Sequence, residues 1–541
     1  MQTRIIHSFL SVGLVICFAR QTFAEGTEPS KWLSFRNGGA SRVTGDFPTS
    51  WAPDDAILWQ QELNGYGQST PVIYGHKVFV STVIGPMKET CCVSCWDLQS
   101  GTSLWAHEFE AATESASNYM HSRAAPTPVV DADGVYVFFE GGDLVALNHE
   151  GEVQWHRDLA ADLGPFTNNH GLGSSPSQTD ELVIISLEHQ GPSYLLAIEK
   201  SSGRTRWKVD RPSGSSWSSP IVVTSQNGPR VIVSSAGSVT AYEASSGQVL
   251  WTLEGLEGNT VPSPTSQGDH LLIGARLPEF GESSAAAKSN LCLRLTDDSY
   301  DVEWRAETVL SDYASPVVAD GCAYFLNKAG VLTCLDLNSG ERHYTKRLGC
   351  SCWATPMVAG DHIYFFGKNG ETHVIRSGPE FERVAVSQLW SADNPPKPET
   401  YVESTGSGHG HQQSSENEAE NPSDVAQTSE AGQQPRGLLA MLLAGDKNGD
   451  GVLTKDEVPP RFQRMAKGGD LNDDDQLDEA EMKAMDESFR ERRAGSREGA
   501  RDPIVYGVAA ADGVIVIRTG TRLFAVSRDA TSNHADTAGG G

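Results

Sequence analysis

The stretch AYEASSGQVLW, residues 241–251, holds a small residue at the end of a strand-like segment, a Ser-Gly turn and a closing Trp. The same order returns in CWDLQSGTSLW (95–105), ALNHEGEVQW (146–155), AIEKSSGRTRW (197–207) and CLDLNSGERHY (334–344). The closing aromatic residue recurs every 40 to 53 residues, at Trp59, Trp105, Trp155, Trp207, Trp251, Trp304, Tyr344 and Trp390. A repeat of this length is typical of the four-stranded blades of a β-propeller.

Each unit also opens in the same way, with small or hydroxyl residues before a proline and an apolar segment, at Pro71, Pro128, Pro176, Pro220, Pro264, Pro316 and Pro356. Two fragments are left over. The segment VYGVAAADGVIVIRTGTRLFAV (505–526) has no Trp strand after it, and the first Trp strand, AILWQQEL (56–63), has no unit before it. Pairing them completes an eighth blade and removes the open sheet edges. The sequence therefore predicts an all-β fold, an eight-bladed β-propeller closed by the N-terminal strand.

The N-terminal residues differ from the rest of the chain. Arg4 is followed by an apolar run over residues 5–19 and by the small-x-small pattern Thr22-Phe23-Ala24. This pattern predicts a secretory signal peptide, so we expect an exported protein, periplasmic or extracellular. No later segment reaches the length of an apolar membrane-spanning helix, so we expect no membrane span. The formal net charge of −28 argues against a nucleic-acid partner.

An insertion of different composition separates the seventh blade from the eighth. Its first part is polar and poor in bulky apolar residues, which predicts disorder. We divide the chain into a signal peptide (1–24), a lead-in segment (25–54), propeller blades (55–390), a disordered linker (391–435), a small α-helical EF-hand pair (436–493), a linker (494–504), the last blade (505–527) and a disordered tail (528–541).

The insertion carries two calcium-loop patterns. DKNGDGVLTKDE (446–457) has oxygen-bearing side chains at positions 1, 3, 5, 9 and 12 and Gly451 at position 6. DLNDDDQLDEAE (470–481) repeats the pattern with Asp475 replacing the glycine, and we expect Leu453 and Leu477 at position 8 to pair the loops. The predicted Ca²⁺ ligands are Asp446, Asn448, Asp450, the Val452 carbonyl, Thr454 and Glu457, and then Asp470, Asn472, Asp474, the Gln476 carbonyl, Asp478 and Glu481.

The Ala-Leu-Asp, Ser-Gly and Trp pattern resembles the repeat of PQQ-like (pyrroloquinoline quinone) β-propellers, over about residues 55–390 and 505–526. Proteins with this repeat include quinoprotein dehydrogenases and non-catalytic scaffolds of the BamB type, and the fold alone does not choose between them. The dehydrogenase type implies a Trp floor, a Ca²⁺ bound by Glu, Asn and Asp, an Asp base and a vicinal disulfide. Cys91 and Cys92 are adjacent, but they fall inside a predicted blade strand. We therefore expect Ca²⁺, rather than PQQ, to be the bound cofactor.

Residues just before each proline converge on the central channel of a propeller. Side chains of His, Arg, Asn and Trp there could form a ligand pocket with several polar groups. The alternative is that they only fill the channel and satisfy the loop backbone. A hydrolase or lyase site built on the two histidines lacks a nucleophile or an acid pair beside them. The candidate pocket residues are His121, Arg123, Asn169, His170, Trp217 and Trp353.

The sequence thus favours an exported, calcium-binding propeller that acts as an interaction scaffold in the cell envelope, with a protein or other envelope component as its partner. The alternative is a quinoprotein dehydrogenase for an alcohol or a sugar. The two differ in colour, because bound PQQ absorbs visible and near-ultraviolet light. The sequence leaves the oligomeric state open.

Overall fold

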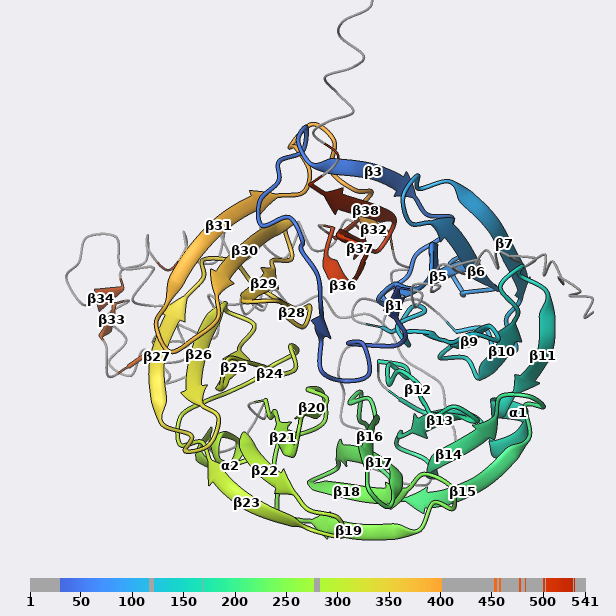
Figure 1. Ribbon diagram of the computed structural model, residues 1–541, viewed down its shortest axis with the longest axis horizontal. Coiled ribbons are helices and arrows are strands. Elements are labelled where there is room, and N and C mark those ends of the chain that lie inside the picture. The colour runs from blue at the N-terminus through green and yellow to red at the C-terminus, as the bar shows by residue number, and fades with distance from the viewer. Residues whose placement is uncertain are drawn as a thin grey trace, which may run out of the picture.

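The computed structural model describes residues 30–115, 121–168, 170–276, 283–400, 503–528 and 530, with short pieces of the insertion at 452–454, 457–458, 476–477, 482 and 500–501. Antiparallel sheets surround a central axis as a ring of eight blades (Figure 1). The four strands of each blade run from the axis to the periphery of the ring, and the strand that carries Trp in most blades is the outermost. The predicted eight-bladed β-propeller is confirmed.

The first four blades follow one another along the chain. Their strands are β4 (Val72–Tyr74), β5 (Lys77–Ile84), β6 (Thr90–Asp97) and β7 (Ser103–Glu110); β8 (Val129–Val130), β9 (Val135–Phe138), β10 (Asp143–Leu147) and β11 (Val153–Asp158); β12 (Ser177–Gln178), β13 (Leu182–Leu187), β14 (Ser193–Glu199) and β15 (Thr205–Arg211); and β16 (Ile221–Ser225), β17 (Gly228–Ser235), β18 (Ser238–Glu243) and β19 (Val249–Leu253).

The next three blades continue the order. Their strands are β20 (Thr265–Gln267), β21 (His270–Ile273), β22 (Leu291–Leu295) and β23 (Tyr300–Arg305); β24 (Val317–Ala319), β25 (Cys322–Leu326), β26 (Val331–Asp336) and β27 (Arg342–Arg347); and β28 (Met357–Ala359), β29 (His362–Phe366), β30 (Glu371–Arg376) and β31 (Glu382–Gln388). Two short helices, α1 (Leu159–Leu163) and α2 (Ser283–Lys288), complete this part of the described chain. The described residues include no helix with the length and apolarity needed to span a bilayer.

The eighth blade joins the two ends of the propeller sequence. It consists of β36 (Val505–Ala511), β37 (Val514–Thr519), β38 (Arg522–Ser527) and, on the outside, β3 (Ile57–Glu62). Trp59 of β3 lies opposite Ala525 of β38, and the blue and red ribbons run side by side in Figure 1. This is the predicted closure by the N-terminal strand.

The recurring Trp and the recurring Gly contact each other across blade boundaries. Trp207 of one blade lies against Gly247 of the next, where a Cβ on the glycine would sit 2.7 Å from the indole ring. The Trp207 indole N–H donates to the Ala244 carbonyl in the same turn at 2.9 Å. The same pairing joins Trp59 to Gly101, Trp105 to Gly151, Trp155 to Gly203 and Trp304 to Gly340. The Ser-Gly turn is therefore a docking site for the preceding blade.

One closing aromatic was predicted wrongly. Opposite Val374, the position that holds Trp in other blades is occupied by Ala385 of β31. Trp390 lies beyond the end of β31, where it packs on Gly370 and stacks on Phe524 with ring centroids 5.9 Å apart. Trp390 therefore packs between the seventh and eighth blades, but from the segment after β31 and not from the strand itself.

A second set of contacts runs around the inside of the ring. The backbone amide of each residue before the first strand donates to the hydroxyl of its counterpart in the next blade. The bonds are 2.9 to 3.2 Å long and connect Thr70, Thr127, Ser175, Ser219, Ser263, Ser315 and Thr355 in that order. We call these seven residues the hydroxyl belt. It stops before the eighth blade, whose first strand follows the insertion.

The lead-in segment crosses one face of the ring (Figure 1). Its strand β1 (Lys31–Trp32) pairs with β4 of the first blade, and β2 (Arg42–Val43) pairs in parallel with β28 of the seventh blade. Between them Arg36 is buried and donates to the Thr265 hydroxyl at 2.7 Å and to the Pro264 carbonyl. Burial lowers the pKa of Arg36 to about 9. The lead-in therefore braces blades on opposite sides of the axis.

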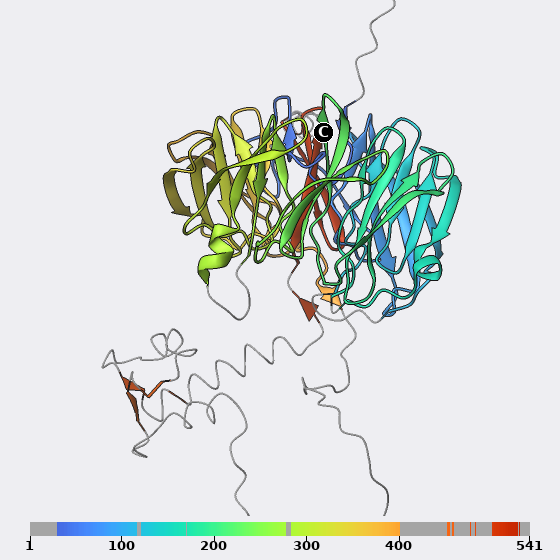
Figure 2. The same ribbon diagram turned by 90° about the horizontal axis from the view of Figure 1, so that it is seen from below.

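The insertion leaves the ring on the opposite face. This face carries the loops that precede the first strands, and we call it the proline face. In side view, α2 and the orange strands at the base of the insertion project from the same face of the disc (Figure 2). These strands, β32 (Glu399–Thr400) and β35 (Ala500–Arg501), pair with each other and bring the two ends of the insertion together.

Candidate interaction surface

The predicted channel residues lie on the proline face in more than one group. His121, His170 and Trp217 form a continuous cluster, with ring centroids 6.2 Å apart for the histidine pair and 5.7 Å apart for His170 and Trp217. His170 is exposed, and the other two are half-buried. Asn169 lies outside the described residues. The three rings therefore form one aromatic surface across blades two to four.

Backbone contacts hold this cluster in place. The Ser122 amide donates to the His170 carbonyl at 2.7 Å, and the Trp217 indole N–H donates to the Gly171 carbonyl at 2.9 Å. The loop of Trp217 is also bonded to the following blade, since its amide donates to the Thr260 carbonyl at 2.7 Å. The side chains thus sit on loops that neighbouring blades fix.

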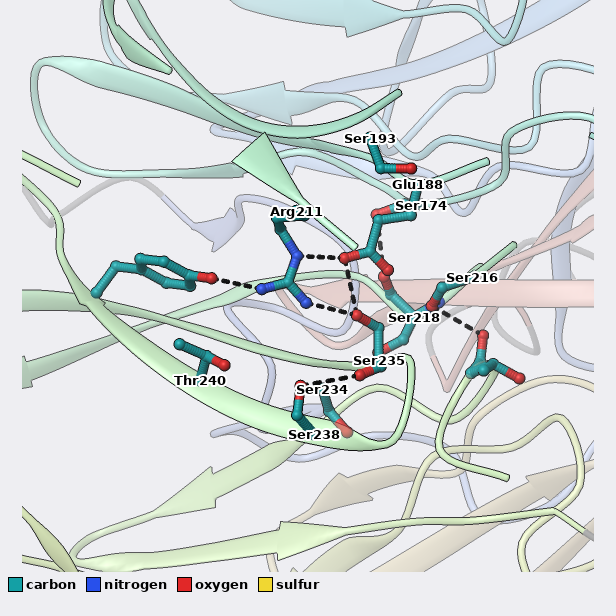
Figure 3. A network of polar contacts seen from close by, with 12 residues as sticks. Ser174, Glu188, Ser193, Arg211, Ser216, Ser218, Ser234, Ser235, Ser238 and Thr240 are labelled. Carbon is teal, nitrogen blue, oxygen red and sulfur yellow. Dashed lines mark hydrogen bonds and ion pairs between the residues drawn. The ribbon is translucent and has the colours of Figure 1, made fainter. Parts of the chain in front are cut away.

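A buried polar network lies beside the Trp217 loop, between the third and fourth blades (Figure 3). Arg211 forms an ion pair with Glu188, and both side chains are almost fully buried. The guanidinium also donates to the Tyr242 hydroxyl and, at 2.7 Å, to Ser235, whose own hydroxyl donates to Glu188 at 2.8 Å. Although burial opposes its charge, the attraction of Glu188 raises the pKa of Arg211. This network joins the third and fourth blades through buried side chains.

The Arg123 side chain is buried and is not exposed at the surface of the proline face. It is 3% exposed, and its guanidinium lies over the Tyr66 ring at 4.5 Å. Its backbone is also held in place, because the Arg123 amide donates to the Gln68 side-chain oxygen at 3.0 Å. For this residue the structure favours the alternative considered from the sequence, in which the side chain fills the channel.

Trp353 belongs to a separate cluster at the sixth and seventh blades. It packs on Tyr313 with ring centroids 4.9 Å apart, and the Lys368 ammonium lies 4.5 Å from the centre of its ring. Trp353, Tyr313 and Lys368 are all half-buried. We call His121, His170, Trp217, Tyr313 and Trp353 the aromatic rim.

Two contributors were not predicted from the sequence. The Tyr506 hydroxyl lies 2.8 Å from the Tyr66 hydroxyl, and the Val505 amide donates to the Lys368 carbonyl at 3.3 Å. Both residues follow the insertion directly. The only sequence signal for them was the predicted ring closure, which places β36 between the first and seventh blades. The returning strand of the insertion is therefore bonded to both sides of the rim.

The described residues do not fit a quinone cofactor. Cys91 and Cys92 lie inside β6, opposite Val83 and Thr82 of the neighbouring strand, and both are buried in the blade. The buried carboxylate of Glu140 accepts from the Ala124 amide at 2.9 Å and from Lys88 at 3.2 Å. These bonds occupy the carboxylate, so it does not fit the role of a catalytic base. Within the described ranges, no three His, Cys, Asp or Glu side chains cluster as metal ligands. The vicinal pair and the base that a quinoprotein needs do not meet at the rim.

A family model described as outer membrane protein assembly factor BamB matches residues 35–186 and 165–376. The chain belongs to this family. Curated relatives include BamB of Yersinia pestis, 24% identical over 287 residues, which cover 47% of this chain and 69% of that protein. BamB of Moranella endobia is 22% identical over 310 residues, covering 56% of this chain and 63% of that protein. The crystal structure of BamB from Moraxella catarrhalis aligns with 61% of this chain and 87% of its own, at 14% identity and a TM-score of 0.45.

The family match ends at residue 376, before the insertion. Of the predicted calcium ligands, only Val452, Thr454, Glu457 and Gln476 lie among the described residues, and the other eight lie outside them. The short strands β33 (Leu453–Thr454) and β34 (Gln476–Leu477) pair antiparallel, with Leu453 opposite Leu477. Both leucines are buried. In the first loop Glu457 accepts from the Thr454 amide at 3.1 Å and from its hydroxyl at 2.7 Å.

Proposed function

We propose that this BamB-family propeller is an exported scaffold of the cell envelope that binds a protein partner with its aromatic rim. The observation that carries the proposal is the rim itself, a set of half-exposed rings held on loops that adjacent blades lock. Trp, Tyr and Arg dominate the binding energy of protein interfaces when they are packed near the centre. A surface that is already rigid loses little conformational entropy on binding.

The family supports a particular class of partner. Relatives with the same repeat bear the name outer membrane protein assembly factor. We therefore propose that the partner is a protein of the outer-membrane assembly apparatus. Export by the predicted signal peptide would bring the chain into the compartment where that apparatus works.

The second part of the proposal is that the insertion binds Ca²⁺. The two loop patterns support it, and so does the alignment of Leu453 with Leu477, because EF-hand loops pair through position 8. Thr454 and Glu457, at positions 9 and 12, also approach each other. Extracellular EF-hands bind weakly, with Kd on the order of 10⁻⁴–10⁻³ M, which suits a structural role. The Ca²⁺-ordered insertion would then add a second contact beside the rim.

The test compares two double variants in cross-linking experiments on intact envelopes. Trp217→Ala with Trp353→Ala removes the two rim indoles. Leu104→Ala with Val302→Ala removes similarly apolar side chains that are 42% and 43% exposed on outer strands. We expect the rim variant to lose at least about tenfold in recovery of an outer-membrane assembly protein, because each anchoring residue typically contributes about 2 kcal/mol.

The control variant should recover that protein as the wild type does, with both variants equally folded by circular dichroism. Equal recovery by the rim variant would remove the rim from the proposal. A quinone absorbance band with alcohol turnover, after addition of PQQ and Ca²⁺, would replace the scaffold by the dehydrogenase alternative.

A further inference from the structure

Two thiols lie side by side at the edge of the proline face. Cys350 and Cys352 are in the loop between β27 and β28, with their sulfur atoms 3.5 Å apart. Ser351 between them is exposed, and so is Gly349 before them. Neither cysteine occupies the Ala/Cys position of the repeat that explains Cys95, Cys292 and Cys334. Their pairing is therefore not a consequence of blade packing alone.

A histidine and a carboxylate complete the group. His373 of β30 lies close enough to Cys350 for their charges to interact, and its Nε2 lies 2.7 Å from Glu371 Oε1. The contact with the Cys352 thiol, together with the nearby His373 imidazole, lowers the pKa of Cys350 even though burial opposes this. Burial would keep His373 neutral, but the Cys350 sulfur and the Glu371 carboxylate raise its pKa. The group therefore places two thiols 3.5 Å apart, with an imidazole and its carboxylate partner beside them.

The chain supplies its own comparison. Cys322 and Cys334 interact with each other, but they lie inside the sixth blade, where the Cys334 thiol contacts the Gly378 carbonyl at 3.7 Å. Both are at most 2% exposed, whereas Cys350 is 7% exposed between two exposed residues. Cys91 and Cys92 are adjacent in sequence, and burial raises the pKa of Cys92 to about 11. Among these pairs, only Cys350 and Cys352 combine proximity, an imidazole and a surface loop.

We propose that Cys350 and Cys352 form a thiol–disulfide exchange site, with Cys350 as the attacking thiolate and Cys352 as the resolving thiol. The substrate class is a disulfide, either of a small molecule or of a protein. The thiolate attacks one sulfur of the disulfide, the S–S bond breaks, and a mixed disulfide with Cys350 forms. The leaving thiolate takes a proton from the His373 imidazolium.

The second step forms the disulfide between Cys350 and Cys352. Cys352 gives its proton to the now neutral His373 and attacks the Cys350 sulfur, which releases the second substrate thiolate. That thiolate takes the proton from His373. In total, two protein thiols become one disulfide, and one substrate disulfide becomes two thiols. Exchange of this kind is fastest when the pKa of the attacking thiol lies near the ambient pH.

The first experiment equilibrates the full-length protein in buffers with varied ratios of oxidised to reduced glutathione. Trypsin releases residues 348–368 as one peptide that holds Cys350, Cys352 and no other cysteine. We expect this peptide to lose two hydrogen atoms reversibly in mass spectra, while Cys322 and Cys334 stay reduced in the native protein. A 348–368 peptide that stays reduced at every ratio would overturn the proposal.

The second experiment assigns the roles with two near-isosteric variants. Cys352→Ser removes the resolving thiol, so glutathione should accumulate on Cys350 as a mixed disulfide. Cys350→Ser removes the attacking thiolate, so Cys352 should gain no glutathione. Equal labelling of both variants, or of neither, would contradict the assignment.

The role of His373 has its own readout. In His373→Gln the imidazolium charge is lost, so the pH midpoint for reaction of Cys350 with iodoacetamide should move upward, and the rate at pH 7 should fall about tenfold. If the folded His373→Gln variant reacts with iodoacetamide at the same pH midpoint as the wild type, His373 does not stabilise the Cys350 thiolate.

Discussion

The backbone amide of Ser175 donates to the hydroxyl of Ser219 in the next blade at 2.9 Å, and this bond is one link of the hydroxyl belt. Both residues are buried. The belt explains why a Ser or Thr stands before the first strand in seven successive units. The hydroxyl is the acceptor for an amide that has no strand partner of its own at that point, and a buried amide without a partner is costly.

Ser219→Ala should therefore destabilise the propeller by about 1–3 kcal/mol, because it leaves the Ser175 amide buried without its acceptor. Ser219→Thr is the matched control, since Thr127 and Thr355 fill the same position in other blades. Urea denaturation followed by Trp fluorescence measures both. The explanation fails if Ala and Thr variants unfold at the same urea concentration as the wild type.

Gly247→Ala should lower the free energy of unfolding more than the same substitution at another glycine with positive φ, Gly268. Gly247 has φ of +74°, and an added Cβ would lie 2.7 Å from the Trp207 ring. Gly268→Ala is the control, with φ of +61° and no atom within 4 Å of the added Cβ. Both variants strain the backbone by about 1–2 kcal/mol, so the difference between their unfolding free energies reports the contacts of the added Cβ with Trp207 and, at 3.0 Å, with Val209 of the preceding blade. Equal losses would mean that the glycine is required only for the turn.

The repeat predicted the ring well because its two signatures mark contacts between blades. Ser-Gly and Trp meet across the boundary between two blades, as Trp207 and Gly247 do, and the Ser219 hydroxyl before the proline accepts from the Ser175 amide across the same boundary. Trp390 shows the limit of this reasoning. Its spacing fits the repeat, but Ala385 of β31 occupies the Trp position opposite Val374, with the same register shift as in the other blades. The spacing between aromatic residues does not show which residue of the outer strand faces the neighbouring strand.

The candidate site was less predictable for a physical reason. The position of a residue in the repeat says which loop it occupies, but not where its side chain points or what it packs on. His121 and His170 do meet, whereas Arg123 turns into the ring against Tyr66. The group of Cys350 and His373 was also missed, because β30 brings the imidazole to the loop from a distant place in the sequence.

The buried ion pair of Glu188 and Arg211 (Figure 3) should be strongly coupled. Glu188→Gln leaves the guanidinium buried without its counter-charge, so we expect a loss of about 3–5 kcal/mol. Arg211→Met should cost a similar amount, because the carboxylate is then unpaired. The double variant should lose clearly less than the sum of the two, by more than about 1 kcal/mol in a double-mutant cycle. Additive losses in urea denaturation would show that the two charges act independently.

Glu457→Gln tests the calcium loop in the full-length chain. Glu457 is the expected bidentate ligand at position 12 of the first loop, and an amide offers Ca²⁺ one neutral oxygen in place of a carboxylate. Isothermal titration should show affinity for Ca²⁺ at the first loop reduced by about tenfold or more, with the second loop still binding. Glu399→Gln changes the same residue type at the base of the insertion, outside both loops, and should leave the titration unchanged. A titration of Glu457→Gln that matches the wild type would mean that the first loop does not bind Ca²⁺ in the predicted way.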